Sequence, residues 1–252
     1  MSAPVFLVEP GDLADVVAGG ELVLTGAEGR HAGVVQRKTP GERVDVVDGA
    51  GVRAVGTVAD VHPDGVRVAV LRVDVEPEPA PRLVLVQALA KGDRDEMAIE
   101  AATEVGVDAV VPWQAERSIV IWRGDRAQKS RQRWVGTVRA ATKQARRART
   151  PDVDHALDGR GLRERTAATV AAGGAVLVLH EEATVPLADV DLPVAGDLLV
   201  VVGPEGGISA RETDDLVAAG ARTVRLGPHV LRTSTAGPVA LALLAQRLGR
   251  WG

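Results

Sequence analysis

The chain has 252 residues, of which 46% are hydrophobic and 25% are charged, and its formal net charge is −4. This length allows one large domain or two modest domains with a buried core. No apolar run approaches the roughly twenty residues that a membrane span needs, and no signal pattern opens the chain, so we expect a cytoplasmic protein. The absence of cysteine excludes disulfides and thiolate chemistry, and the five histidines lack metal-ligand spacing, so we expect no metal site.

The positive charge of the chain is concentrated in one segment. Between Arg123 and Arg149 there are ten basic residues against Asp125 alone, a local charge of about +9, which leaves about −13 for the rest. A solvated helix face normally alternates the sign of its charges. The excess of one sign therefore favours an anionic partner over a merely solvated face.

The first part of the chain predicts a small β-barrel. Residues 1–75 contain short valine-rich runs separated by glycine and proline turns, typical of strands, at 5–8, 21–24, 43–47, 52–61 and 66–73. One helical piece, 31–38, interrupts them and ends in two basic residues. Proline alternates with charge over 76–81, which keeps that segment extended, so we expect a domain boundary there.

From Arg82 onward, strands alternate with helices, as in a parallel sheet covered on both faces. The expected strands are 83–89, 109–112, 175–179, 198–202 and 223–226. The expected helices are 96–105, 162–172 and a long basic helix over 127–148. Arg117, in the triplet Glu116-Arg117-Ser118, follows a strand end, where α/β proteins place ligand-binding residues. The adjacent carboxylates Glu181 and Glu182 more often lie on the surface than act as an acid/base pair.

Two loops near the carboxyl end each follow a strand and each lead into a helix. Gly203-Pro204-Glu205-Gly206-Gly207 is followed by Ser209 and Glu212, which form a capping box that starts a helix. The second loop, from Gly227 to Ala236, follows the strand 223–226 and leads into an apolar helix over 239–248. Glycines permit close backbone approach, and helix N-termini present free N–H groups, so such loops suit a bound ligand. Taken alone, however, a turn of this kind is more often a simple connection between a strand and a helix. Neither the ending of a P-loop nor the spacing of a dinucleotide fingerprint is present, so a nucleotide phosphate is disfavoured.

These paired loops resemble those of the bacterial 16S ribosomal RNA uridine N3-methyltransferases, members of the SPOUT class. The resemblance rests on Gly203 to Gly207 with Ser209 and Glu212, and on Leu226-Gly227-Pro228-x-Val230-Leu231-Arg232-Thr233-x-Thr235-Ala236. It implies an α/β fold in which a trefoil-knotted methyltransferase domain, 82–252, follows a linker, 76–81, and an N-terminal RNA-binding domain similar to the PUA fold, 1–75. It also implies S-adenosylmethionine as cofactor, 16S ribosomal RNA or the small ribosomal subunit as partner, and a homodimer.

The resemblance implies roles for individual residues. Cofactor binding falls on Leu179, Gly203, Pro204, Glu205, Gly207, Leu226, Gly227, Val230, Leu231 and Thr235. Arg232 is the first candidate for stabilising the uracil anion, and Thr233 and His229 are further catalytic candidates. An alternative role for Arg232 is a structural hydrogen bond to a backbone carbonyl, which the sequence favours almost equally. RNA contacts fall on Arg30, Arg37, Lys38, Arg117, Arg139, Lys143, Arg146 and Arg147. The chain departs from the family pattern at Ala101, Lys143, Ala145, Arg146 and His229.

The cofactor loops do not specify the acceptor, so two alternatives stay open. One is a SPOUT enzyme that methylates a ribose hydroxyl or another base. The other is an RNA-binding protein without activity, against which the intact loops argue.

Overall fold

A computed structural model describes residues 3–251 of the protein. The chain forms two compact units: unit 1 contains the chain up to Glu78 together with Thr142–Thr150, and unit 2 contains Pro79–Ala141 and the chain from Pro151 onward. Each unit has its own sheet and its own apolar core. None of the helices that the structure describes combines the length and the apolar character of a membrane span.

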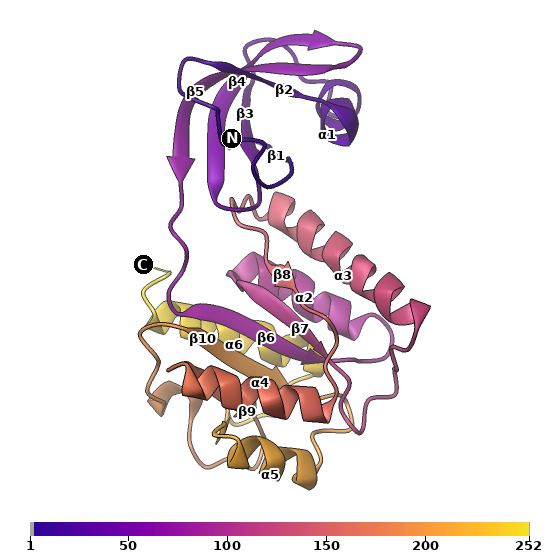
Figure 1. The fold of residues 1–252 in the computed structure, drawn as a ribbon, viewed down its shortest axis with the longest axis vertical. Helices are drawn as coiled ribbons and strands as arrows, with labels where there is room; N and C mark the ends of the chain where they lie inside the picture. Colours follow the sequence, from indigo (N-terminus) through magenta and orange to yellow (C-terminus); the bar gives the residue numbers. More distant parts are fainter. Residues whose placement is uncertain (1–2, 252) are drawn as a thin grey trace. The chain divides into compact units, whose positions relative to one another are not determined.

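Unit 1 is built on the five predicted strands, which form one curled sheet around an apolar core (Figure 1). Alternate residues face that core, because side chains of a strand point to opposite faces; Val66, Val68 and Val70 are all buried. Across the sheet the order is β1 (Val5–Leu7), β3 (Arg43–Val47), β4 (Val52–His62), β5 (Gly65–Val75) and β2 (Glu21–Leu24).

The helical piece of unit 1 begins earlier than the prediction of 31–38. Helix α1 (Gly26–Arg30) continues directly into a π-helical turn, His31–Val35. Gly26 and Gly29 lower the helix propensity of α1, so the sequence does not reveal this helix. Gly29 is buried, and a Cβ there would lie 2.3 Å from the carbonyl oxygen of Leu24, so glycine is what lets α1 pack against the end of β2.

Unit 2 is a six-stranded sheet in which every pairing is parallel. The order across the sheet is β11 (Arg222–Val224), β9 (Ala175–Leu179), β10 (Asp197–Val202), β6 (Arg82–Ala88), β7 (Ala109–Trp113) and β8 (Asp152–Val153). The strands are near-continuous apolar runs because both faces are covered. The alternating strand-and-helix pattern of the sequence is thereby confirmed as an α/β fold.

Helices cover both faces of this sheet (Figure 1). On β6, Leu83 and Leu85 belong to the core beneath α2 (Arg94–Val105), α3 (Asp125–Gln144) and α6 (Thr233–Arg247). Val84 and Val86 belong to the opposite core, beneath α4 (Gly159–Ala171) and α5 (Ala210–Ala218). Successive side chains of a strand point to opposite faces, so the residues of β6 contribute alternately to the two cores.

The long basic helix is shorter than the predicted 127–148. It ends at Gln144, and Arg146 adopts a left-handed backbone with φ 57°. Beyond it, Ala148 packs with Val5, Leu7 and Val47 in a small core of unit 1. Ala148, which the sequence placed at the end of the helix, therefore packs against the sheet of unit 1 instead.

The chain crosses itself on one face of unit 2. Strand β11 lies at the sheet edge, yet α6, which follows it, packs on β6 and β10 in the middle of the sheet. The connection from β9 to β10 lies on that same face, and the Arg247 guanidinium of α6 donates to the carbonyl oxygens of Leu187 at 2.9 Å and Val190 at 2.6 Å in that connection. This is the chain path that the predicted knotted SPOUT class requires.

Helix α6 begins at Thr233, whereas the sequence predicted a loop up to Ala236 and a helix over 239–248. Gly237 and Pro238 conceal this first part, because both residues are poor helix formers. Both are buried. A Cβ on Gly237 would lie 2.8 Å from Cδ1 of Leu85 on β6, so the glycine lets α6 approach the sheet closely.

We predict that Gly237→Ala destabilises the protein by about 2 kcal/mol, which lowers the melting temperature by about 6 °C, because the added methyl group overpacks a core contact. Gly136→Ala is the matched control. Gly136 lies on the exposed side of α3 with nothing within 4 Å of an added Cβ, so alanine there should raise stability through its helix propensity. Equal melting temperatures for the two variants in a thermal scan would contradict the close contact.

Candidate functional site

Apart from Thr235, which lies in the first turn of α6, the predicted cofactor residues lie at or after the carboxyl ends of three adjacent strands. β9 lies between β11 and β10 in the sheet. Leu179 ends β9, the glycine loop 203–209 follows β10, and the loop 226–232 follows β11. In open α/β sheets ligands bind at this edge of the strands. The fold therefore brings together loops that are distant in the sequence.

The glycine loop has a defined backbone. The Gly207 N–H donates to the Pro204 carbonyl oxygen at 2.9 Å, and Gly207 has φ +71°, which favours glycine. The predicted capping box at the start of α5 is confirmed: the Ser209 hydroxyl accepts from the Glu212 N–H, and the Glu212 carboxylate accepts from the Ser209 N–H. The loop thus ends in a capped helix.

Glu205 holds the glycine loop to the loop after β6. Its carboxylate accepts hydrogen bonds from the Lys91 N–H at 3.1 Å and from the Arg94 guanidinium at 2.8 Å. Partial burial raises the pKa of Glu205, but hydrogen bonds from backbone N–H groups and from Arg94 outweigh it and hold the pKa below its usual value. Arg94 has no signal in the sequence that marks it as part of the site.

The triplet after β7 contacts the same loop. The Arg117 guanidinium donates to the Gly206 carbonyl oxygen at 3.0 Å. The Ser209 hydroxyl donates to Glu116 at 2.8 Å, and the Glu116 N–H donates to Glu212 at 2.7 Å. Arg117, which the family resemblance marks for RNA, therefore also orders the glycine loop.

The loop after β11 is open to solvent. Val230 is 75% exposed, and Leu231, His229 and Arg232 are exposed as well. Nothing lies within 4 Å of a Cβ added to Gly227, so there is free space beside its backbone. Exposed apolar side chains next to free space are what a flat organic ligand would cover.

Thr233 differs from its predicted catalytic neighbours because it is buried. Its hydroxyl donates to the Gly203 carbonyl oxygen at 2.7 Å and accepts from the Gln87 side-chain amide at 2.9 Å. The first residue of α6 is thereby bonded to the glycine loop and to the central strand. Gln87 was not among the predicted site residues, although a polar residue within the apolar run of β6 is a signal that could have found it.

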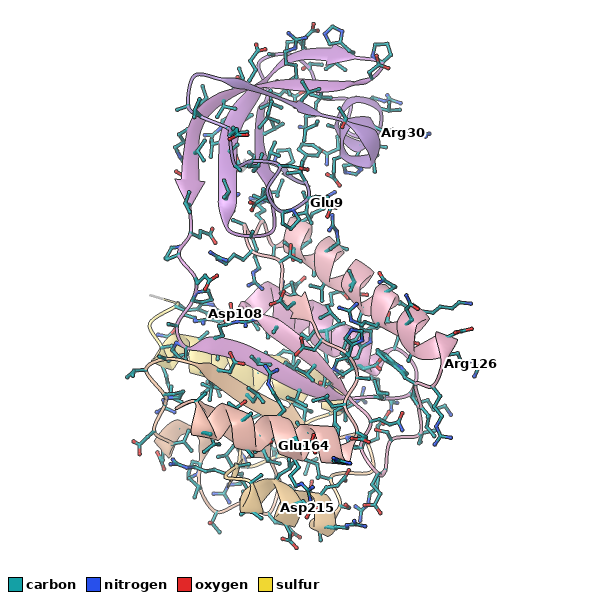
Figure 2. All side chains as sticks on the ribbon, viewed as in Figure 1. Glu9, Arg30, Asp108, Arg126, Glu164 and Asp215 are labelled. Carbon is teal, nitrogen blue, oxygen red and sulfur yellow. The ribbon has the colours of Figure 1, made fainter. Side chains whose placement is uncertain are left out.

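The basic residues of the 123–149 segment have different surroundings. Arg131 donates to the Val153 carbonyl oxygen, and Arg133 pairs with Asp93 and Glu96, which raises the pKa of Arg133. Arg139 and Arg147 also have partners within the protein. Arg123, Arg126 and Lys129 are exposed near the start of α3, where Figure 2 labels Arg126. Some of the basic residues predicted to meet an anionic partner, such as Arg131 and Arg133, therefore bind groups within the protein instead.

The RNA candidates of unit 1 also fall into two groups. Lys143 pairs with Glu28 at 2.6 Å, and Lys38 pairs with Glu42 at 2.7 Å. The Lys38 and Thr39 hydrogen bonds lower the pKa of Glu42 to about 2. In contrast, Arg30, labelled in Figure 2, Arg37 and Arg146 are exposed.

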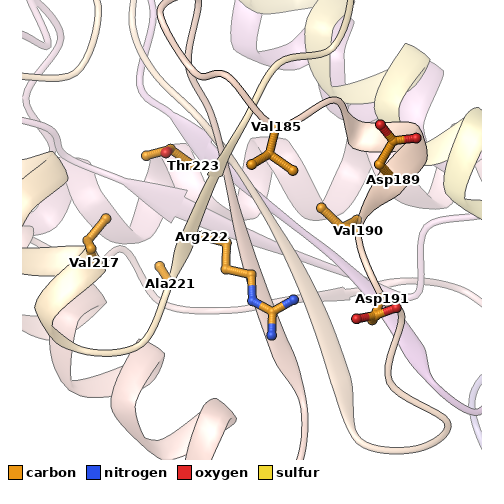
Figure 3. Close-up of a pocket in the computed structure, with 8 residues that line it drawn as sticks. All are labelled: Val185, Asp189, Val190, Asp191, Val217, Ala221, Arg222 and Thr223. Carbon is orange, nitrogen blue, oxygen red and sulfur yellow. The ribbon is translucent and has the colours of Figure 1, made fainter.

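A separate pocket lies at the other end of β11. It has a volume of about 370 Å³, and Arg222 extends across it (Figure 3). None of the predicted site residues lines it; its lining consists of Val185, Asp189, Val190, Asp191, Val217, Ala221, Arg222 and Thr223. Because it opens at the amino end of β11, it is distinct from the glycine loops.

Among residues 3–251, no group of three or more His, Asp or Glu side chains is arranged to hold a metal ion. Glu181 and Glu182 are exposed after β9. The two carboxylates therefore lie on the surface, as the sequence favoured.

Comparisons with protein families cover both units. A family model described as an RNA methyltransferase domain matches residues 76–245, and one described as an RNA methyltransferase PUA domain matches residues 24–71. A protein of Mycobacterium bovis named ribosomal RNA small subunit methyltransferase E is 48% identical over 92% of this chain and 89% of its own length. The protein of that name from Bacillus subtilis is 30% identical over 88% of each chain.

Solved structures have the same fold. A ribosomal RNA small subunit methyltransferase E from Neisseria gonorrhoeae, bound to S-adenosylmethionine, has a TM-score of 0.84, 27% identity and coverage of 98% of both chains. A methyltransferase from Legionella pneumophila, described as a complex with the same cofactor, has a TM-score of 0.82, 27% identity and the same coverage.

Proposed function

The chain belongs to the RNA methyltransferase family of ribosomal RNA small subunit methyltransferase E, and from this premise we propose that it transfers a methyl group from S-adenosylmethionine to N3 of a uridine in 16S ribosomal RNA, acting in the cytoplasm. The observation that carries the proposal is the pair of loops, 203–209 and 226–232, joined through Thr233 at the carboxyl ends of the strands. The relatives that are 48% and 30% identical to this chain are named ribosomal RNA small subunit methyltransferase E.

The residues present fit the cofactor. The free space at Gly227 and the exposed apolar side chains of Val230 and Leu231 suit an adenosine. We assign the binding of S-adenosylmethionine to the predicted set, in which backbone groups carry the polar contacts: Leu179, Gly203, Pro204, Glu205, Gly207, Leu226, Gly227, Val230, Leu231 and Thr235. When bound, S-adenosylmethionine supplies an electrophilic methyl group on a positively charged sulfur.

The side chains of the second loop suit the acceptor base. Uridine N3 must lose its proton before it accepts a methyl group, and the negative charge then spreads over the two uracil carbonyls. Arg232 is exposed directly before α6, so its guanidinium is available to stabilise that charge. His229, exposed in the same loop, is the candidate for accepting that proton.

Two other activities remain as alternatives for the same loops. A ribose 2′-hydroxyl acceptor needs the same cofactor site but a different base pocket. An RNA-binding protein without activity needs no cofactor site, and the free space at Gly227 argues against it.

We predict that the purified protein binds S-adenosylmethionine and converts one uridine of 16S ribosomal RNA, or of the small subunit, into 3-methyluridine, as nucleoside mass spectrometry will detect. Gly227→Ala should weaken the cofactor affinity at least tenfold without lowering the melting temperature, because the added methyl group enters space that is free in the protein. Gly136→Ala is the control and should change neither the affinity nor the product. A ribose-methylated product would select the first alternative, and a protein that binds RNA but no S-adenosylmethionine would select the second.

Unit 1 and the basic segment are proposed to bind the RNA backbone. The candidates are the basic residues predicted above: Arg30, Arg37, Lys38, Arg117, Arg139, Lys143, Arg146 and Arg147. Arg30, Arg37 and Arg146 support the proposal most strongly because they are exposed. The Arg146 backbone is also fixed, since its carbonyl oxygen accepts from Arg53 at 2.7 Å.

We predict that Arg37→Gln and Arg146→Gln each weaken RNA binding and each reduce the slope of log affinity against log salt by about 1, because each removes a phosphate contact. Filter binding over a salt series measures both quantities. Arg72→Gln is the control with the same loss of charge: Arg72 is exposed on β5 and pairs with Asp74. Equal slopes for all three variants would show that Arg37 and Arg146 do not contact phosphate.

A homodimer is also proposed. Seven of the fifteen residues of α6 are buried in unit 2, but Val239 and Leu243, one turn apart, are 37% and 48% exposed. We predict that the protein sediments as a dimer and that Leu243→Glu increases the monomer fraction, because the variant places a charge in an apolar contact. Leu71→Glu, at an exposed apolar residue of unit 1, should leave the dimer intact. A monomeric wild-type protein in the ultracentrifuge would contradict the proposal.

A further inference from the structure

Gln87 is an amide in a strand that is otherwise apolar. It is the last residue but one of β6 and has no exposed surface. Burying an amide is unfavourable unless its polar atoms find partners, so leucine would be the simpler choice for the core. Within residues 3–251, the side-chain oxygen of Gln87 has no hydrogen-bond partner. The stability of the core therefore does not explain why an amide side chain occupies this position.

The nitrogen of this side chain has two acceptors. It donates to the Thr233 hydroxyl at 2.9 Å and to the Ala88 carbonyl oxygen at 3.2 Å. Exchange of the amide nitrogen and oxygen would place two carbonyl oxygens against each other at Ala88, so these contacts fix the orientation. The Thr233 hydroxyl has a single hydrogen, which goes to the Gly203 carbonyl oxygen. The hydrogen bonds thus run in one direction, from Gln87 through Thr233 to Gly203.

This relay joins three segments that each matter to the cofactor loops. Gln87 lies opposite Val202 in the pairing of β6 with β10, directly before the glycine loop. Thr233 is the first residue of α6, directly after the loop 226–232. Loss of the relay frees the Gly203 carbonyl and the start of α6 to move independently, which changes the separation of the two loops.

We propose that Gln87 is a positioning residue that acts through the Thr233 hydroxyl to set the Gly203 loop against the second loop, and so determines the affinity for S-adenosylmethionine. The inference rests on the proposed function for the identity of the ligand. It also assigns Thr233 to positioning and leaves Arg232 and His229 as the candidates for contact with the base.

Calorimetric titration with S-adenosylmethionine tests the relay in the full-length protein. Gln87→Leu and Thr233→Val should each weaken the affinity about tenfold, because each removes one link. The double variant should be no weaker than the weaker single variant, because both links serve one relay. Thr233→Ser, which keeps the hydroxyl, should stay within about twofold of the wild type. The melting temperatures of these variants should remain within about 4 °C of the wild type.

The kinetic readout separates positioning from catalysis. A positioning role raises the KM for S-adenosylmethionine in both single variants. A catalytic Thr233 instead lowers kcat in Thr233→Val and leaves Gln87→Leu unchanged, and that result would overturn the inference. A hundredfold loss in the double variant, or unaltered affinity in both single variants, would overturn it equally. If Gln87→Leu does not fold, the affinities of Thr233→Val and Thr233→Ser still test the inference. Weaker affinity in Thr233→Val alone supports it, and equal affinities in the two variants overturn it.

A further measurement keeps the relay and the proposed function distinguishable. Hydrogen exchange of the 203–207 amides, measured without ligand, should be faster in Gln87→Leu and Thr233→Val than in Thr233→Ser. If the wild type binds no S-adenosylmethionine, the proposed function fails, and unchanged exchange in the two variants would then overturn the relay separately.

Discussion

The close approach of α6 to the centre of the sheet is the constraint on which the rest of the structure depends. Gly237 permits it, since a Cβ there would meet Leu85, and Thr233 fixes it through its bond to the Gly203 carbonyl oxygen. The chain leaves the sheet edge at β11 and returns to its middle, where Arg247 of α6 binds the β9–β10 connection. The crossing therefore places the two loops beside each other, and a site follows from the path of the backbone.

The side chains around the glycine loop have mainly an ordering role. Glu205 joins it to Lys91 and Arg94, and Arg117 binds the Gly206 carbonyl oxygen. The loop backbone is thus defined before any ligand arrives, which reduces the entropy lost on binding. The second loop is exposed and supplies apolar surface and a guanidinium. The glycine loop is held in place by hydrogen bonds, and the loop 226–232 presents exposed side chains.

Local patterns in the sequence predicted much of this arrangement. The capping box at Ser209 and Glu212 is present as expected, and the alternation of strands and helices gives the α/β class. Features that depend on contacts between distant parts of the chain were harder to predict. The start of α6 was hidden by Gly237 and Pro238, whose value lies in contacts with a strand far away in the sequence. The packing of Ala148 on Val5 and Leu7, and the Gln87 bond to Thr233, likewise depend on tertiary structure that no local pattern encodes.

The central claim is that the two glycine-containing loops enclose a methyl donor. Hydrogen exchange of the purified protein with and without S-adenosylmethionine tests it most directly. We expect bound S-adenosylmethionine to slow exchange in 203–209 and in 226–232, with no change at the pocket that Arg222 lines. Protection at that pocket, or no protection in either loop at saturating S-adenosylmethionine, would contradict it.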